Sequence, residues 1–232
     1  MEIRMHDLKH DYLNPTGEAH SVLDIPGWTI PTGKQVLLRG VSGSGKTTLF
    51  NIMAGLLHPT GGTVYFGDQL LYGLTEAQRD HFRAQHIGYI FQQHFLIQSL
   101  SALENVRMPM RFANRLSPAQ ATDKAVHLLE KVGLKSHLHH RPKQLSMGQR
   151  LRVSIARALA NPVSLVLADE PTAALDPSHA HDMIRLIREN CESMGATLVM
   201  ASHDPSVSLY FSTIMDLKHG QLLQHSSEVK SL

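Results

Sequence analysis

The stretch Gly40-Val41-Ser42-Gly43-Ser44-Gly45-Lys46-Thr47 decides the fold of this chain. It follows an apolar, strand-like run at residues 35–39 and leads into a helix-like segment that starts at Thr48. A strand that ends in a glycine-rich turn and opens a helix directs several backbone N–H groups and the positive end of the helix dipole at one point. Polyphosphate binds at such a point. We therefore predict a phosphate-binding loop; the alternative is a glycine-rich turn with an incidental lysine.

Each residue type in this stretch has its own use. Gly40, Gly43 and Gly45 let the backbone curl without Cβ clashes. Lys46 reaches the β- and γ-phosphates, and the hydroxyl of Thr47 can ligate Mg²⁺. The stretch thus predicts a site for a nucleoside triphosphate together with its metal ion.

The composition is that of an ordinary globular protein. The chain has 232 residues, of which 42% are hydrophobic and 18% charged, with a net charge of +2. This length allows a large core in one domain or in two lobes. No nucleic-acid partner is expected, because proteins that bind DNA or RNA usually gather Lys and Arg on one face.

Neither secretion nor membrane insertion is expected. The lone Cys191 excludes an internal disulfide, which fits a reducing compartment. The start at residues 1–7 lacks the basic-then-apolar layout of a signal peptide, and no apolar run approaches the length of a membrane span. We expect the chain by itself to be soluble and intracellular.

Strand-like and helical segments alternate along the chain, which predicts an α/β fold with a mostly parallel sheet. Antiparallel strands are expected in residues 1–30, around a turn at 14–17. Amphipathic helical patterns, including residues 121–132 and 149–160, dominate from about 76 to 160 and predict a helical lobe inserted into the sheet domain. The other expected strands lie at residues 63–66, 165–168 and 197–200, and a final hairpin is expected at 215–223.

Two adjacent carboxylates, Asp169 and Glu170, end the apolar run at residues 164–168. In a phosphate-loop enzyme Asp169 holds the hydration shell of Mg²⁺, and Glu170 can turn into the site as the general base. The alternative is a pair of solvated carboxylates at a strand end. The loop at 40–47 favours the functional interpretation, because that site still lacks a metal carboxylate and a base.

Further polar residues stand at the ends of predicted elements. Ser146 is placed as the N-cap of a helical pattern at residues 151–159, which makes this helix start a second anion site or only a cap. Asp176 follows the two carboxylates. His203 ends the next strand, where its imidazole can hydrogen-bond a γ-phosphate. The crowded His137, His139 and His140 have no Cys or carboxylate at a familiar spacing, so a solvated junction is favoured over a metal site.

In order and spacing, these motifs resemble those of the ATP-binding cassette ATPases over essentially the full length. The similar motifs are the Walker A loop at 40–47, the Q-loop glutamine Gln92, the signature at 145–149, the Walker B carboxylates Asp169 and Glu170, the D-loop Asp176 and the switch histidine His203. The resemblance implies an α/β P-loop NTPase with a RecA-like core, an antiparallel β-subdomain and an inserted α-helical subdomain at about 93–160. Residues 1–232 would then form one nucleotide-binding domain.

The resemblance also implies roles for individual residues. The implied ATP ligands within one chain are Tyr12, Gly40, Ser42, Gly43, Ser44, Gly45, Lys46, Thr47 and Thr48, and those supplied in trans are Ser146, Gly148, Gln149 and Asp176. The implied Mg²⁺ ligands are Thr47, Gln92 and Asp169, and the implied catalytic residues are Lys46, Gln92, Glu170 and His203. For the aromatic that stacks on adenine, Trp28 is an alternative to Tyr12, as is a buried structural role for Tyr12.

A head-to-tail homodimer follows from the resemblance, with ATP between Lys46 and Thr47 of one chain and Ser146 and Gly148 of the other. ATP binding would close the dimer, and hydrolysis would release it. The chain departs from the family at Met147, where the signature usually has Gly. Because the implied contacts come from Ser146 and Gly148, we expect a working signature with a bulkier rim.

Residues 87–92 together with 102–110 look like the lipoprotein-release and macrolide-export branch of that family. This likeness implies an ATPase subunit that powers export or extraction through a transmembrane permease, at the cytoplasmic side of the inner membrane. A short permease helix would fit a groove near Gln92. The apolar residues that line this groove, or else form lobe core, are Phe95, Leu96, Leu100 and Leu103.

Other functions stay open at this point. One is a mechanotransmitting ATPase of the cell-division type, which signals through a membrane partner without moving a solute. Another is a cassette ATPase that acts on DNA or ribosomes, although such proteins usually carry a coiled-coil insert or a second cassette. A small-molecule kinase would need neither the signature serine nor the dimer.

Overall fold

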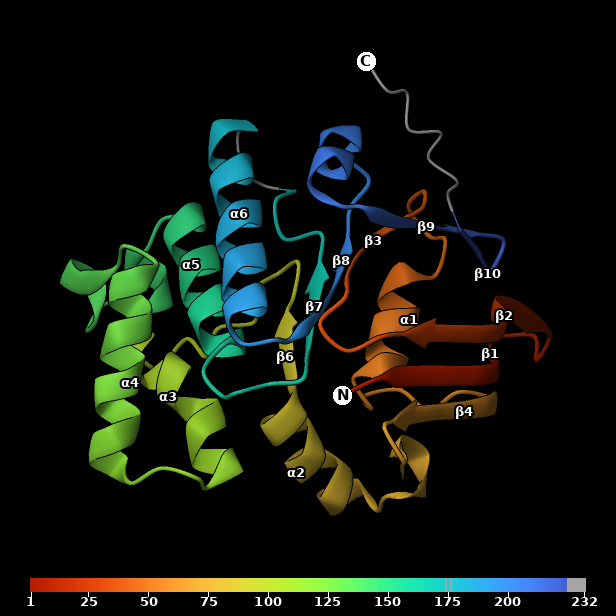
Figure 1. Ribbon diagram of the computed structural model, residues 1–232, viewed down its shortest axis with the longest axis horizontal. Coiled ribbons are helices and arrows are strands. Elements are labelled where there is room, and N and C mark those ends of the chain that lie inside the picture. The colour runs from red at the N-terminus through yellow and green to blue at the C-terminus, as the bar shows by residue number, and fades with distance from the viewer. Residues whose placement is uncertain (174, 176, 225–232) are drawn as a thin grey trace.

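The computed structural model describes residues 1–173, 175 and 177–224, which form two sheets and the helices around them (Figure 1). One sheet is antiparallel with the order β2-β1-β4-β5. Its strands are β1 (Ile3–Leu13), β2 (Ala19–Ile30), β4 (Gly61–Phe66) and β5 (Gln69–Leu70). Alternate side chains of a strand face opposite sides, and the inward set of β1 begins with the fully buried Ile3 and Met5. The expected antiparallel pair around the turn at 14–17 is confirmed.

The second sheet has the order β10-β9-β3-β8-β7-β6, and all but β10 run parallel. Its strands are β3 (Gln35–Arg39), β6 (Ile87–Ile90), β7 (Leu165–Asp169), β8 (Thr197–Ala201), β9 (Thr213–Lys218) and β10 (Gln221–Gln224). Every residue of β6, β7 and β8 is buried, as expected for strands covered on both faces. This sheet confirms the predicted α/β fold, and β9 and β10 are the predicted final hairpin.

Helices cover the parallel sheet from two sides. Helix α1 (Lys46–Met53) packs between the two sheets, in one apolar cluster with Val36 and Leu38 of β3. Leu37 points the other way and packs with Ile184 and Ile187 of α6 (Pro177–Ser193). The phosphate loop is therefore held between a central strand and a helix that is buried along one side.

Between β6 and β7 the chain forms α3 (Ala102–Ala113), α4 (Pro118–Lys131) and α5 (Met147–Ala158), which lie on the opposite side of the molecule from α1 in Figure 1. They share an apolar cluster that includes Val106, Leu129 and Val153. Helix α4 begins earlier than the pattern at residues 121–132 indicated, because Ser117 caps it with a capping box. Ser146 caps α5 in the same way, as predicted.

The remaining elements are short or peripheral. Helix α2 (Glu76–His86) leads into β6. The 3₁₀ turns are Leu71–Gly73, Lys135–His137, Pro142–Gln144 and Pro205–Tyr210. No helix in the described part of the chain has both the length and the apolar character that a bilayer crossing requires.

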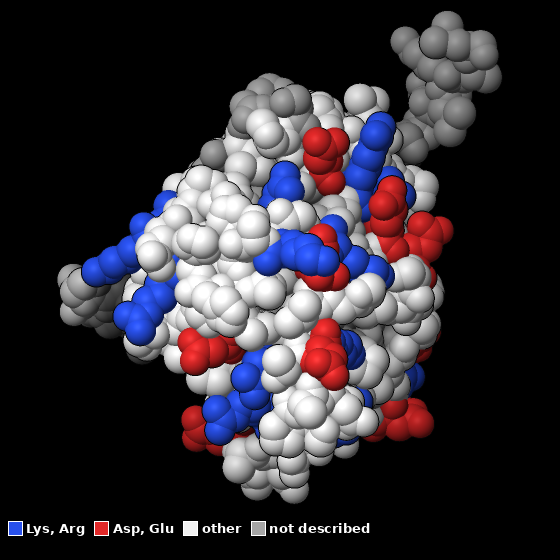
Figure 2. Space-filling model, turned by 90° about the vertical axis from the view of Figure 1, so that its left-hand side faces the viewer, with Lys and Arg blue, Asp and Glu red and all other residues white. Residues whose placement is uncertain are grey.

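Charged side chains do not segregate on the face shown in Figure 2. Lys and Arg are interspersed there with Asp and Glu and with uncharged areas. This face therefore presents no field of a single sign.

Candidate active site

The loop between β3 and α1 has the backbone that its glycines predict. Gly43 and Gly45 have φ of 79° and 98°, in the left-handed region that disfavours side chains. Position 40 requires glycine for a steric reason, because a Cβ on Gly40 would lie 2.7 Å from the carbonyl oxygen of Leu217. Gly45 is the N-cap of α1 and makes no side-chain cap bond, so the first N–H groups of the helix remain available to a ligand.

Lys46 lies folded back over this loop. Its Nζ donates hydrogen bonds to the carbonyl oxygens of Gly40 (2.7 Å) and Val41 (3.2 Å), and its side chain is 8% exposed. The hydroxyl oxygen of Ser44 is buried without a hydrogen-bond partner among the described residues. A free helix N-terminus, a buried ammonium group and an unsatisfied hydroxyl in one loop fit a phosphate group, which supplies several acceptor oxygens.

Asp169 ends β7 beside the first turn of α1. Its Oδ2 accepts a hydrogen bond of 2.7 Å from the Thr47 hydroxyl. Burial raises the pKa of Asp169, the charge of Glu170 raises it further, and the bond from Thr47 opposes both effects. A buried carboxylate next to a hydroxyl offers the oxygen ligands that Mg²⁺ prefers, and a bound cation would lower this pKa again.

Glu170 reaches the same site by a turn of the backbone. Its φ of 46° lies in the left-handed region, and its N–H donates to the carbonyl oxygen of Ala201 at 3.0 Å. Its carboxylate is buried between two donors, with Oε1 3.7 Å from Lys46 Nζ and Oε2 2.8 Å from His203 Nδ1. Neighbouring residues of a straight strand would point to opposite faces, so this turn is what brings Glu170 to the phosphate loop.

These side chains line one hollow of about 660 Å³, which is in the size range of ligand pockets. Its lining consists of Tyr12, His20, Val22, Val41, Ser42, Gly43, Ser44, Gly45, Lys46, Thr47, Thr48, Gln92, Asp169, Glu170 and His203. The structure thus brings together the predicted loop residues from Ser42 to Thr48, the Q-loop glutamine, the carboxylate pair and the switch histidine, whereas Gly40 lines another hollow.

Tyr12 lies at the hollow, and Trp28 does not. The Tyr12 hydroxyl is 3.4 Å from Thr48 Oγ1 and the side chain is 46% exposed, whereas Trp28 belongs to the buried core. Sequence reasoning missed His20 and Val22 of β2. The signal was the hairpin register, which pairs His20 with Tyr12 across the turn at 14–17.

The signature residues lie outside this hollow, at the start of α5. The Ser146 hydroxyl accepts the N–H of Gln149 at 3.2 Å, and Gln149 Oε1 accepts the N–H of Ser146 at 2.9 Å. Met147 is 46% exposed and Gly148 is partly exposed. The predicted D-loop residue Asp176 falls outside the described residues.

The histidine-rich segment contacts the signature. His137 Nε2 lies 3.1 Å from Gln149 Nε2, and the rings of His137 and His140 are 5.0 Å apart. In the described ranges, no group of three or more His, Cys, Asp or Glu is arranged to hold a metal ion.

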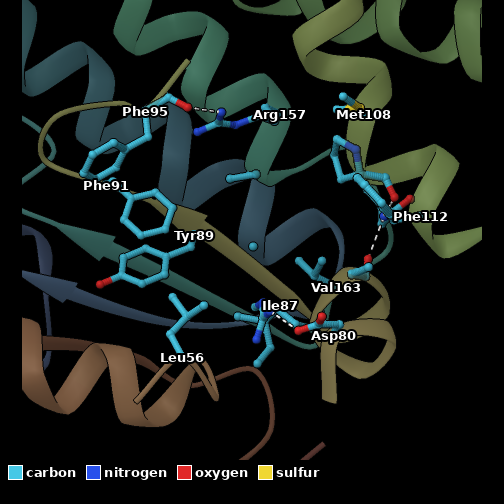
Figure 3. A pocket seen from close by; sticks show the side chains of 16 residues that line it. Leu56, Asp80, Ile87, Tyr89, Phe91, Phe95, Met108, Phe112, Arg157 and Val163 are labelled. Atoms are coloured by element: carbon cyan, nitrogen blue, oxygen red, sulfur yellow. Dashed lines mark hydrogen bonds and ion pairs between the residues drawn. The ribbon is translucent and has the colours of Figure 1, made fainter. Parts of the chain in front are cut away.

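A second hollow, of about 480 Å³, opens beside the Q-loop (Figure 3). Its aromatic side consists of Phe95, Phe91 and Tyr89, and the rings of the last two stack at 3.8 Å. Phe95 is 60% exposed, whereas Leu96 and Leu103 pack in the apolar cluster of α3, α4 and α5. The four apolar residues after Gln92 therefore have different surroundings: Phe95 lines the groove, Leu96 belongs to the core, Leu103 is partly buried against the core, and Leu100 lines a separate hollow.

A glycine loop between a parallel strand and a helix, facing carboxylates at the end of a second strand, defines a P-loop nucleotide-binding ATPase. The protein-family model described as "ABC transporter" matches residues 23–173 of this chain. The chain belongs to the ABC transporter family.

Named relatives and solved structures agree with this assignment. The lipoprotein-releasing system ATP-binding protein LolD of Shewanella denitrificans is 42% identical over 93% of this chain and 90% of its own length. The macrolide export ATP-binding/permease protein MacB of Burkholderia thailandensis is 42% identical over 87% of this chain, but the match spans only 31% of that longer protein.

A dimeric post-hydrolysis structure of the ATP-binding cassette MJ0796, bound to ADP and Pi, has a TM-score of 0.89 at 35% identity. It covers 96% of this chain and 97% of that chain. A second dimeric structure of MJ0796, described as a bacterial ABC transporter cassette, has a TM-score of 0.88 at 36% identity. The predicted P-loop fold, family and ATPase class are confirmed.

Proposed function

We propose that this chain is the ATP-binding and hydrolysing subunit of an ABC transporter that powers export or extraction through a separate transmembrane permease. The observation that carries this proposal is the position of Glu170, whose buried carboxylate lies between Lys46 and His203 at the mouth of the phosphate loop. The relatives named LolD and MacB support the release or export direction.

In this proposal the described residues divide the chemistry among them. The loop N–H groups and Lys46 bind and orient the β- and γ-phosphates. Glu170 accepts the proton of the attacking water, and His203 steadies the γ-phosphate. Thr47, Asp169 and Gln92 would hold Mg²⁺, which supplies charge neutralisation on the phosphates. Tyr12 would stack on the base, since its ring lies beside the same loop.

Gly148 supports the proposed homodimer. Gly148 is the second residue of α5, and glycine is a weaker helix former than Ala, by about 1 kcal/mol in a helix interior. Nothing among the described residues of the chain requires it, because a Cβ there would meet Leu175 Cδ2 at 3.8 Å, an ordinary contact. The described residues thus give no reason for a glycine at this position, and ATP held by a second copy would supply one. The dimeric MJ0796 cassettes are consistent with such a pair.

We propose that the permease binds in the groove shown in Figure 3, the hollow beside the Q-loop. Phe95 and Phe112, which are 60% and 67% exposed, leave large apolar surfaces uncovered beside the loop that carries Gln92. A short apolar helix of a partner would bury them, in the helix-in-groove mode. Because the chain would reach the membrane through this partner, we propose a peripheral location on the cytoplasmic side of the inner membrane.

The substitution Glu170→Gln tests the ATPase role. It keeps the size of the side chain and removes the base, so ATP should still bind while turnover stops and a dimer accumulates. Size-exclusion chromatography with light scattering, with and without ATP, measures the dimer, and phosphate release measures turnover. Glu192→Gln, at an exposed position of α6, is the matched control. Wild-type turnover in Glu170→Gln would refute the assignment of the base.

The mechanotransmitting role is the second candidate, since it uses the same site and the same groove. Reconstitution with the permease separates the two candidates. ATP-driven movement of a substrate supports the transporter, whereas hydrolysis that depends on the permease without any substrate movement supports the signalling role.

A further inference from the structure

Two residues after Gln92, the backbone enters an unusual conformation. His94 and Phe95 have φ of 61° and 41°, so two consecutive residues with side chains occupy the left-handed region. Such residues are costly singly and persist where surrounding contacts hold them. Within the loop, His94 N–H donates to the carbonyl oxygen of Phe91 and Phe95 N–H to that of Gln93.

Arg157 supplies the contacts that hold this backbone. Its Nη2 donates to the carbonyl oxygen of His94 at 2.6 Å, and its Nη1 donates to that of Phe95 at 2.7 Å. The second bond is drawn in Figure 3. Burial lowers the pKa of Arg157 to about 10, so the guanidinium is still charged at neutral pH. Two short, charge-assisted bonds from one planar group fix the position of both carbonyl groups.

The loop that carries Gln92 is thus anchored at both ends. Before Gln92, the ring of Phe91 stacks on Tyr89 at 3.8 Å. After Gln92, Arg157 donates hydrogen bonds to the carbonyl oxygens of His94 and Phe95. Gln92 itself is exposed and lines the nucleotide hollow, so its position depends on these two anchors.

Arg157 also connects this loop to the signature. It lies in the last turn of α5, and Ser146 caps the first turn of the same helix. A helix of 12 residues is about 18 Å long, so α5 spans the distance between these two contacts. Phe95, whose carbonyl group Arg157 holds, presents its ring to the groove. One side chain therefore joins the groove, the Q-loop and the helix that carries Ser146.

From these contacts we propose that Arg157 is a positioning residue, which holds Gln92 in place for hydrolysis and ties the Q-loop to the signature helix. The proposal rests on the proposed ATPase function. Arg157 touches neither the phosphate loop nor the base, so its loss should lower kcat and leave the binding of ATP unchanged.

The experiment compares Arg157→Gln and Arg157→Lys with wild type, in the full chain. Arg157→Gln should lower kcat at least tenfold, since each of the two charge-assisted hydrogen bonds that it loses is worth about one such factor, while KM for ATP stays within twofold. Hydrogen exchange of the amides in residues 91–97 should become about tenfold faster. Arg157→Lys keeps the charge and one donor at a time, so it should recover part of both effects.

Arg152→Lys is the matched control. Arg152 lies on the same helix and donates to the carbonyl oxygen of Val132 at 3.1 Å, away from the Q-loop. It should change neither kcat nor exchange at residues 91–97. The proposal is overturned if Arg157→Gln retains kcat within twofold, if KM rises in parallel, or if Arg152→Lys gives the same loss. Failure of the ATPase function itself would already appear in the wild-type protein, as absent ATP binding or hydrolysis.

Discussion

His203 donates two hydrogen bonds to one carboxylate oxygen of Glu170, from Nδ1 at 2.8 Å and from its backbone N–H at 3.3 Å. The other oxygen lies 3.7 Å from Lys46 Nζ. The proposed base is therefore held by the two groups that are expected to bind the γ-phosphate. In the proposed ATP-bound state, Lys46 and His203 would turn to the phosphate, which would free Glu170 to accept a proton from water.

The substitution His203→Ala is expected to lower kcat by about a hundredfold or more, as removal of one preorganised donor does in other enzymes. ATP affinity should change only a few-fold, because the phosphate loop is untouched and Glu170 keeps the backbone bond at position 203. Stopped-flow ATP binding and steady-state hydrolysis measure the two effects. His139→Ala, at an exposed loop position, serves as the control. A loss of affinity as large as the loss of kcat would contradict this role.

The parts of the fold that follow local rules could be predicted from the sequence. The glycines at 43 and 45 have the positive φ that their place before a helix requires, and the buried strands β7 and β8 were visible as apolar runs. The carboxylates at 169 and 170 follow from the same local pattern, because β7 ends there. These features depend on neighbours in sequence, which a single chain displays directly.

Features that depend on tertiary contacts could not be predicted in this way. Leu96 and Phe95 are adjacent and both apolar, yet Leu96 packs in the core and Phe95 in the groove, because the left-handed turn redirects them. His20 reaches the hollow through the register of β1 and β2. The hydrogen bonds from Arg157 to the backbone of His94 and Phe95 join residues more than sixty positions apart, and no local sequence pattern indicates them.

Protonation of Asp169 should make the stability of the folded protein depend on pH. Its pKa is raised in the folded state, mainly by burial, so the folded state binds the proton more tightly than the unfolded state. Stability from this group is therefore present at low pH and is lost as pH rises from the ordinary Asp value near 4 through the raised value. At neutral pH each unit of upward shift costs about 1.4 kcal/mol.

The substitution Asp169→Asn should accordingly stabilise the ATP-free protein at pH 7, with a gain that shrinks toward pH 4. The amide oxygen can still accept the bond from Thr47. Urea unfolding at several pH values measures the gain, and Asp182→Asn at an exposed position of α6 should show none. Hydrolysis with Mg²⁺ should be lost, because a metal carboxylate is gone. A variant that is destabilised equally at both pH values would contradict the assigned cause.

Ser146 and Ser117 offer a matched pair for the proposed shared site. Both are exposed N-cap serines, both lie in a capping box whose other member is a Gln, and they begin α5 and α4. Each Ser→Ala substitution should cost about 1 kcal/mol of stability through the lost cap. Only Ser146 is expected to contact ATP held by the second copy.

Ser146→Ala should therefore slow hydrolysis by about a hundredfold to a thousandfold, the range for a lost charge-stabilising donor, while Ser117→Ala hydrolyses ATP at the wild-type rate. In the Glu170→Gln background, Ser146→Ala should also weaken the ATP-dependent dimer, which sedimentation velocity measures. Because both variants lose the same cap, a difference in rate between them reports the contact in trans and not helix stability. Equal rates, or a dimer unaffected by Ser146→Ala, would remove Ser146 from the site.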